Sequence, residues 1–223
     1  MKYIQIDNNE IIENSDNINN IEECIYENYS LTLKGRASLE IITNDSMLIT
    51  ELLLSNIFSY KDNIISTEII VPFLASFVNN VKIQDLKTEI KILDDNKNNE
   101  EIIYLMGEFH RIYNELIEKE KKYELQESVY NRCFSFKYFI PVYYWIKGNN
   151  FCDVCIKHQI VEGKLYAYIM RTFYFVEEIT HFYIKFGNEK LAKIFLIIKN
   201  NILKGIMSVE SLYLKDNINI EHI

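Results

Sequence analysis

The residues best suited to metal chemistry are Cys152, Cys155 and His158, in the segment FCDVCIKH. On a helix, spacings of three residues would place two thiols and an imidazole, all of them zinc ligands, on one face. A structural zinc site usually needs a fourth ligand from a second ligand pair, and the sequence holds no other closely spaced pair of cysteines or histidines. We therefore expect no metal site and interpret the cysteines as buried or half-buried thiols on a short helix.

Motifs for phosphate binding or nucleophilic catalysis are absent from the sequence. None of the six glycines forms the G-x-x-x-x-G-K-[ST] loop that holds nucleotide phosphates, and no Asp-Glu-x-His box is available for magnesium. The four histidines have no serine or cysteine partner in a recognisable catalytic motif. We expect no catalytic residue and no cofactor in this chain, so it should not hydrolyse ATP by itself.

The charge of the chain limits how it can contact nucleic acid. The 223 residues carry a formal net charge of −8, so no overall positive field attracts phosphates. Any such contact must be local or must come from another part of an assembly. The segment MKYIQIDNNEII is too polar for a signal peptide, and no apolar run reaches about 18 residues. We expect a soluble intracellular protein without a membrane segment.

Helical periodicity dominates the elements that must position these residues. Hydrophobic residues make up 48% of the chain, and six glycines and two prolines are too few for a turn-rich β-fold. The pattern predicts an all-α, multi-helix bundle without an alternating strand pair. The expected helices cover about residues 47–54, 66–78, 100–126, 134–146, 151–157 and 162–186, followed by a last helix after 188.

Capping residues predict where several of these helices begin and end. Gly35 allows a turn before a helix, and Asn44 or Asp45 can cap the next helix. Gly187 suits the left-handed end of a helix, and Asn188 supplies a cap oxygen for the helix that follows. Two prolines lie inside predicted helices. Pro72 should kink or interrupt the helix over 66–78, and Pro141 should bend the helix over 134–146.

The chain divides into three parts by composition. Residues 1–28 are acidic and rich in asparagine, which predicts an irregular lead-in. Residues 29–214 form the helical domain, with a long polar connection over 79–99. A short tail, 215–223, completes the chain.

Two separated stretches resemble one known family in the same order. LTLKGRASLEI…DSMLITELLLSNIF is similar to the opening of the DSHCT domain, the C-terminal helical domain of superkiller-type and Mtr-type exosome-associated DExH-box RNA helicases. VYYWIKGNNFCDVC…EGKLYAYIMR…FGNEKL…SLYL resembles the end of that domain. The positions that carry this similarity are Gly35, Glu51, Trp145, Gly148, Glu162, Gly163, Gly187, Asn188, Leu212 and Tyr213.

The resemblance implies a domain that packs on two RecA-like lobes, closes over the RNA path and helps to feed single-stranded RNA toward the exosome. It implies RNA contacts at Arg171, Lys204 and Arg36. ATP and magnesium would bind the helicase core, in the same chain or in another one. Exosome-associated proteins are further expected partners. The location would be the nucleus for the Mtr-type branch or the cytoplasm for the superkiller-type branch, with the nucleus favoured.

The chemistry of these residues allows more than one interpretation. Arg171 lies off the apolar stripe of its predicted helix, so it can pair with phosphate or stack on a base, or it can be an exposed, solvated charge. Trp145 is expected to pack in the core at a helix end. Glu162 is interpreted as a carboxylate at a helix start rather than a catalytic acid.

The sequence departs from the family pattern where RNA contact is expected. Ala167 and Met170 replace arginines, Tyr174 replaces an acidic residue, and Gly205 breaks a basic–acidic pair after Lys204. Fewer cations predict weaker RNA binding with a shallower salt dependence. Two functions therefore compete: a helicase accessory domain that contacts RNA, and a protein–protein interaction module that has lost RNA binding. An unrelated helical enzyme is a third hypothesis, without a supporting motif.

Overall fold

The computed structural model of the chain describes residues 4–6, 29–78, 100–122 and 133–204. Eight α-helices lie within these ranges and confirm the predicted all-α bundle. They are α2 (Leu33–Ser38), α3 (Ser46–Leu54), α4 (Thr67–Ala75), α6 (Glu100–Lys122), α7 (Phe139–Ile146), α8 (Phe151–Lys157), α9 (Glu162–Phe186) and α10 (Glu189–Ile202). The predicted connection 79–99, the tail 215–223 and most of the lead-in lie outside the described residues, so the domain limits stay predictions.

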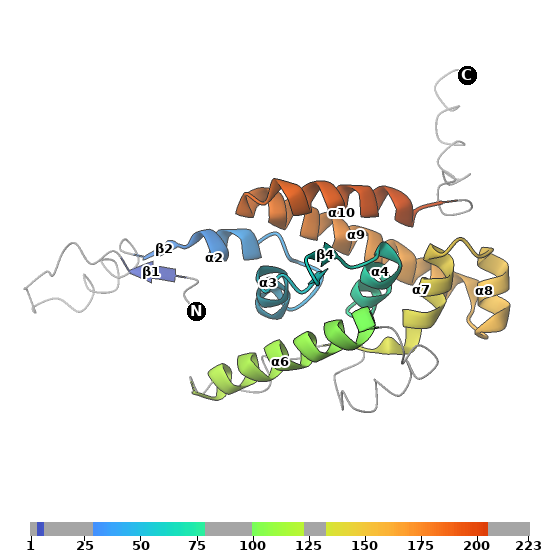
Figure 1. Ribbon diagram of the computed structural model, residues 1–223, viewed down its shortest axis with the longest axis horizontal. Coiled ribbons are helices and arrows are strands. Elements are labelled where there is room, and N and C mark those ends of the chain that lie inside the picture. The colour runs from blue at the N-terminus through green and yellow to red at the C-terminus, as the bar shows by residue number, and fades with distance from the viewer. Residues whose placement is uncertain (1–3, 7–28, 79–99, 123–132, 205–223) are drawn as a thin grey trace, which may run out of the picture.

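The helices are arranged around the long helix α9. Figure 1 shows α9 and α10 along one side of the molecule, α6 along the opposite side, and α3 and α4 between them. The turn at Gly187 reverses the chain, so that Tyr183 and Phe195 meet with ring centroids 5.4 Å apart. α4 packs on both α7 and α9, whereas α2 packs on α9 and α3 packs on α6.

A cluster of phenylalanines joins these helices into one core. Phe134 contacts Phe73, Phe77 and Phe109, with ring centroids between 4.5 and 6.1 Å apart. These four rings are at most 1% exposed and come from α4, the turn after it, α6 and the segment before α7. Edge-to-face and stacked packing of aromatic rings adds to the gain from burying large apolar surface. The core is therefore continuous across the bundle.

Pro72 does not interrupt its helix, and the position of Pro141 does not require the predicted bend. Pro72 lies inside α4, which continues to Ala75 and ends three residues before the predicted Val78. The predicted helix over 134–146 begins only at Phe139, after a short 3-10 turn, η3 (Phe136–Tyr138). Pro141 thus lies in the first turn of α7. The backbone nitrogen there needs no partner within the helix, so no bend is required.

The prediction that the chain has no strand pair was wrong. β3 (Ser59–Tyr60) and β4 (Asn63–Ile64) form a hairpin, and β1 (Ile4–Ile6) pairs antiparallel with β2 (Tyr29–Leu31). The hairpin turn places Lys61 and Asp62 at φ values of 49° and 64°. Two residues of positive φ suit the right-handed twist of a hairpin. Lys-Asp lacks the glycine that usually announces such a turn, which is why the sequence pattern missed it.

The capping predictions hold, except at Gly35. Asp45 accepts hydrogen bonds from the backbone nitrogens of two residues of α3, both at 3.0 Å, and Asn188 accepts one from α10 at 3.1 Å. Gly187 has a φ of 82°, in the left-handed region. Gly35 does not form a turn before a helix, because it lies within α2 itself. Its N–H donates to Oγ1 of Thr32, the residue that caps α2.

Among the described residues, no helix is both long enough and apolar enough to cross a bilayer.

Candidate nucleic-acid interface

The helix α9 presents one buried and one exposed face. The apolar stripe that helical spacing predicts along it consists of Leu165, Ile169, Phe173, Val176, Ile179, Tyr183 and Phe186, and most of these residues are buried. Phe173 and Phe186 are exceptions, since both are only half-buried. Phe173 lies toward α10, where the ammonium of Lys199 sits 5.1 Å from its ring centroid. Phe175 and Phe182 fill the core instead.

Arg171 lies on α9 beside a stacked pair of tyrosines. The rings of Tyr138 and Tyr168 have centroids 3.6 Å apart and planes inclined by 23°. Burial raises the pKa of Tyr168, Tyr138 raises it further, and the positive charge of Arg171 lowers it. Arg171 is itself exposed and forms no hydrogen bond or ion pair with any residue that the structure describes. Its guanidinium is thus available to an external ligand.

A second cation flanks the same tyrosine pair. Lys137 is exposed, and its ammonium lies 5.8 Å from the ring centroid of Tyr138. Tyr138 is 7% exposed and Tyr168 is half-buried, so burial holds both rings in place next to the two cations. Cations next to aromatic rings are the groups by which proteins bind single-stranded nucleic acid without reading its sequence.

The carboxylates on the following turns of α9 have partners inside the protein. Glu177 forms an ion pair with Lys199 of α10. Glu178 accepts hydrogen bonds from the backbone nitrogens of Ile42 and Thr43, both at 3.0 Å. Because these acidic groups are engaged, they do not neutralise Arg171 through a direct contact.

The other two predicted RNA-binding residues lie elsewhere. Arg36 is exposed on α2, which packs on α9. Glu40, just after α2, forms an ion pair with Lys185 in the last turn of α9. Lys204 is half-buried and donates to the carbonyl of Ile146 at 2.9 Å. In Figure 1, α2 and α7 lie toward opposite ends of α9. The structure therefore does not bring the three cations together.

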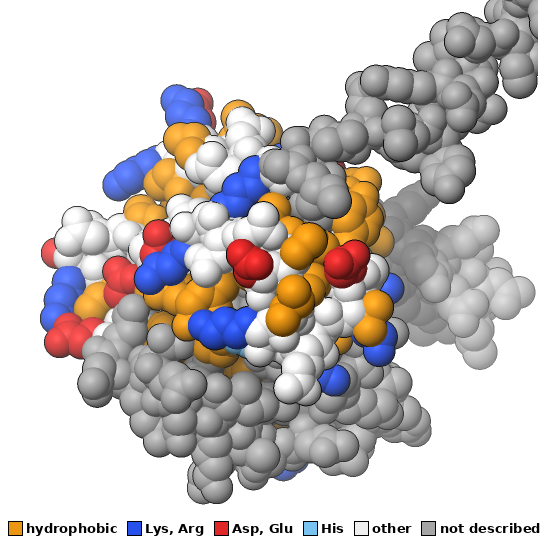
Figure 2. Space-filling view, turned by 90° about the vertical axis from the view of Figure 1, so that its right-hand side faces the viewer, with side chains coloured by type: hydrophobic (Ala, Val, Ile, Leu, Met, Phe, Trp, Pro, Cys, Tyr) orange, Lys and Arg blue, Asp and Glu red, His pale blue; other side chains and the backbone are white. Residues whose placement is uncertain are grey.

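Three consecutive aromatic residues at the end of α7 each lie under a lysine ammonium. The distances from nitrogen to ring centroid are 4.7 Å for Lys147–Tyr143, 4.0 Å for Lys157–Tyr144 and 5.2 Å for Lys204–Trp145. Burial lowers the pKa of Lys204. Figure 2 views the molecule from this side and shows basic side chains dispersed among hydrophobic ones rather than gathered into one patch. Positive charge near a helix C-terminus is a stabilising arrangement, which accounts for Lys204.

The structure shows the position and the contacts of most residues that were predicted to have structural roles. Trp145 is 4% exposed and donates from Nε1 to the carbonyl of Ile202 at 3.1 Å, which confirms the predicted core position. Gly148 has a φ of 99°, which favours glycine. Glu162 and Gly163 open α9, and Glu51 forms an ion pair with Lys34. Leu212 and Tyr213 lie outside the described residues.

The cysteine and histidine segment does not form a metal centre in the described part of the chain. Cys152 is exposed and Cys155 is buried, so the two thiols do not share one accessible face. Burial raises the pKa of the Cys155 thiol. His158 packs its ring against Tyr144, with centroids 5.4 Å apart, and its Nε2 is buried without a hydrogen-bond partner in the described structure.

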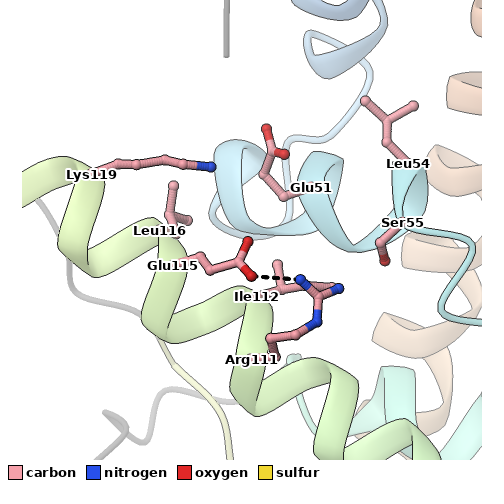
Figure 3. Close-up of a pocket in the computed structure, with 8 residues that line it drawn as sticks. All are labelled: Glu51, Leu54, Ser55, Arg111, Ile112, Glu115, Leu116 and Lys119. Atoms are coloured by element: carbon pink, nitrogen blue, oxygen red, sulfur yellow. Dashed lines mark hydrogen bonds and ion pairs between the residues drawn. The ribbon is translucent and has the colours of Figure 1, made fainter.

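A small hollow lies between α3 and α6 (Figure 3). Its volume is about 170 Å³, below the range of about 300–1,000 Å³ that is typical of small-molecule sites. Arg111 in its wall already pairs with Glu108 at 2.7 Å and Glu115 at 2.6 Å. The hollow is therefore smaller than a typical small-molecule site, and the guanidinium in its wall is already engaged.

Sequence reasoning missed the tyrosines around Arg171. Tyr138 is more than thirty positions away from Arg171 in the chain, so spacing gave no signal for their proximity. Tyr166 and Tyr174 were open to detection, because both lie off the apolar stripe of α9. They are 45% and 53% exposed, high values for aromatic side chains.

Comparison with known proteins gives the family. Residues 28–210 match the DSHCT (NUC185) domain. An uncharacterized helicase of Schizosaccharomyces pombe is 27% identical over 200 residues, which cover 86% of this chain and 18% of that protein. The mRNA transport homolog 4 of Caenorhabditis elegans is 24% identical over 187 residues, which cover 83% of this chain and 17% of that protein. The chain thus spans less than a fifth of either relative, and with most of its length matched it belongs to the DSHCT (NUC185) domain family.

Proposed function

We propose that the chain is the helical accessory domain of an RNA helicase and guides single-stranded RNA along α9 toward degradation by the exosome. The observation that carries this proposal is Arg171, which is exposed and unpaired among the described residues and lies beside the stacked rings of Tyr138 and Tyr168. A guanidinium can pair with phosphate or stack on a base. The names of the two relatives, a helicase and an mRNA transport homolog, support the same class of function.

The proposed partner is a RecA-like helicase core, in the same chain or in another one. That core would bind ATP and magnesium, and exosome-associated proteins would join the assembly, in the nucleus by preference. The share of each relative that the chain covers, 18% and 17%, leaves ample length for such a core. Leu39 and Ile42, which follow α2 and are 65% and 82% exposed, offer apolar surface for the contact. Copurification of a chain with helicase motifs would support this partner, and its loss in a Leu39→Asp/Ile42→Asp variant would map the contact.

The central experiment measures the affinity of the chain for a single-stranded RNA oligomer at about 50 mM and about 200 mM salt. Arg171→Gln should weaken binding about tenfold, because one charge-assisted contact is lost. It should also reduce the slope of log affinity against log salt by about 0.7, the value for one phosphate. Lys121→Gln is the matched control, since it removes an exposed charge at the far end of α6.

The competing function is a protein–protein interaction module without RNA binding. The net charge of −8 and the dispersed basic side chains in Figure 2 favour it. It predicts that RNA affinity stays undetectable at low salt and that Arg171→Gln changes nothing. That result would overturn the RNA proposal and leave the helicase-core contact to be tested by copurification.

A further inference from the structure

The end of the molecule at which α7 and α8 lie in Figure 1 carries two lysines whose ammoniums lie on tyrosine rings. The nitrogen of Lys147 lies 4.7 Å from the ring centroid of Tyr143, and the nitrogen of Lys157 lies 4.0 Å from that of Tyr144. The two rings contact each other edge to face, with centroids 5.8 Å apart. We call these four residues the lysine–tyrosine face. Its lysines are exposed and its tyrosines are half-buried.

The positive charges of this face are oriented but not neutralised. Neither lysine forms an ion pair with any residue that the structure describes, whereas Lys61 and Lys185 on other elements pair with carboxylates. Tyr143 raises the pKa of Lys147, and Glu68 adds to the effect, so this ammonium keeps its charge. An aromatic ring attracts a cation without cancelling its charge. The face therefore presents two free positive charges on a chain whose net charge is −8.

Exposed apolar side chains lie close to the lysine–tyrosine face in the sequence. Ile156 directly precedes Lys157 in α8 and is 76% exposed, and Val161, which precedes α9, is 67% exposed. Side chains of this type are more often buried. Figure 2 views this end of the molecule and shows basic side chains among hydrophobic ones. Apolar contact area within a polar surround is the usual make-up of a protein–protein interface.

We propose that the lysine–tyrosine face and Ile156 bind an acidic segment of a partner protein that also carries an apolar side chain. Carboxylates of the segment would pair with Lys147 and Lys157, and the apolar side chain would cover Ile156. The distances within the face keep the two ammoniums no more than about 15 Å apart, which about five residues of extended chain span. A short linear segment is therefore sufficient. The inference does not depend on the RNA contact proposed for Arg171.

Two exposed carboxylates favour a protein segment over nucleic acid at this surface. Asp153 in α8 and Glu162 in the first turn of α9 lie on either side of Lys157 in the sequence. A nucleic-acid backbone carries a negative charge at every nucleotide, so it would be repelled by both carboxylates. A protein segment can place carboxylates opposite the lysines and neutral residues opposite Asp153 and Glu162.

The same charges disfavour an uncharged partner. A neutral segment would cover Lys147 and Lys157 without supplying a carboxylate, and removing an unpaired charge from water is costly. An acidic segment compensates this cost and is attracted to the surface before contact. Charge complementarity therefore determines the class of partner.

The test selects the ligand without assuming its sequence. Random peptides displayed on phage would be selected on the full chain, and the enriched peptides would then be compared on Lys147→Gln/Lys157→Gln. We expect enriched peptides with two or more Asp or Glu residues and a large apolar residue within about five positions. We also expect these peptides to lose binding to the double variant.

Fluorescence anisotropy of one enriched peptide would measure each contribution. Lys147→Gln/Lys157→Gln should weaken binding about tenfold, because two charge-assisted contacts are lost. Ile156→Ser should weaken it about fivefold, because apolar surface is no longer covered. Lys121→Gln/Lys190→Gln is the matched control, since it removes two exposed lysines from α6 and α10 and should leave the affinity unchanged. Urea unfolding of each variant would establish that the fold is intact.

Two outcomes would overturn the proposal. One is that no peptide binds the wild type better than it binds Lys147→Gln/Lys157→Gln, or that the enriched peptides are not acidic. The other is that the double variant weakens binding of a labelled oligoadenylate as much as Arg171→Gln does, since the surface would then serve RNA. If acidic peptides depend on the two lysines while no variant or wild type binds RNA, this inference stands and the proposed RNA contact fails.

Discussion

At the scale of single residues, the cations differ in whether a group within the protein already binds them. Lys204, Arg111 and Lys199 all have partners: a carbonyl, two carboxylates and one carboxylate respectively. Arg171 has no such partner among the described residues, and it lies beside exposed aromatic surface. The difference among these four cations comes from their neighbours, since their intrinsic chemistry is similar. Arg171 is therefore the cation on which we base the RNA proposal.

A prediction at the residue scale concerns the dependence of stability on pH through His158. Burial lowers the pKa of His158 below its usual value of about 6.5, and Lys157 adds to the effect. The unfolded chain therefore binds a proton at His158 in a pH range in which the folded chain does not. The stabilising contribution is complete above about pH 6.5 and is lost as pH falls from there through the lowered pKa of the folded state.

His158→Gln should remove this part of the pH dependence. We expect the decline in free energy of unfolding between about pH 7.5 and about pH 5.5 to be shallower in the variant than in the wild type. Urea unfolding at both pH values measures it. His181→Gln, at an exposed position of α9, is the control and should follow the wild type. Equal pH dependence in His158→Gln and the wild type would contradict the prediction.

At the scale of elements, α9 connects stability with function because its two faces have different roles. Its buried face packs on α10, α2 and α4, which fixes the helix in place. Its outer face keeps Tyr166, Arg171 and Tyr174 exposed. The same helical periodicity that buries one set of residues thus presents the other. A rigid helix is a better support for a binding surface than a loop.

Replacement by alanine should change the free energy of unfolding in opposite directions at two glycines, one at a helix end and one within a helix. Gly187 has a φ of 82°, and an alanine there would be strained, although its Cβ would meet nothing within 4 Å. Gly187→Ala should therefore cost about 1–2 kcal/mol of stability. Gly107 is exposed in the middle of α6 with equal space around it, so Gly107→Ala should gain up to about 1 kcal/mol. Urea unfolding of both variants measures these changes. A change of stability in the same direction in both variants would contradict the prediction.

At the scale of the whole molecule, the phenylalanine core predicts that the described helices unfold as one cooperative unit. Phe134 lies between helices that are far apart in sequence and has no exposed surface. Phe134→Ala should cost about 3–5 kcal/mol, from lost burial and the remaining cavity. Circular dichroism reports all helices, whereas Trp145, the only tryptophan, reports the end of α7. Because the core is continuous, both signals should shift to the same lower urea midpoint.

Ile103→Ala is the control for this prediction. Ile103 lies on α6 and is 59% exposed, so its loss should change stability by no more than about 0.5 kcal/mol. Two separate unfolding transitions in Phe134→Ala, one for each signal, would show that the helices do not unfold as one unit.

The sequence predicted much of the fold because the relevant interactions are local. The helix over 151–157 and the Gly187–Asn188 break depend on residues within one or two turns of each other, and the structure has them as expected. The hairpin at Lys61–Asp62 was missed because its turn lacks a glycine. The start of α7 was misplaced because the apolar run before it packs as a 3-10 turn and a core phenylalanine rather than as helix.

The sequence by itself determined the helices, most of their caps and the family, because periodicity and capping act over at most a few turns and leave a readable pattern. Only the tertiary structure decided which side chains are available to a ligand. It brought Tyr138 onto Tyr168 beside Arg171, and it placed Lys204 on Trp145. It also placed the carboxylate of Glu178 where it accepts a hydrogen bond from the backbone nitrogen of Thr43, 135 positions away in the chain. Burial and ion pairing depend on neighbours distant in sequence, and no local pattern records them.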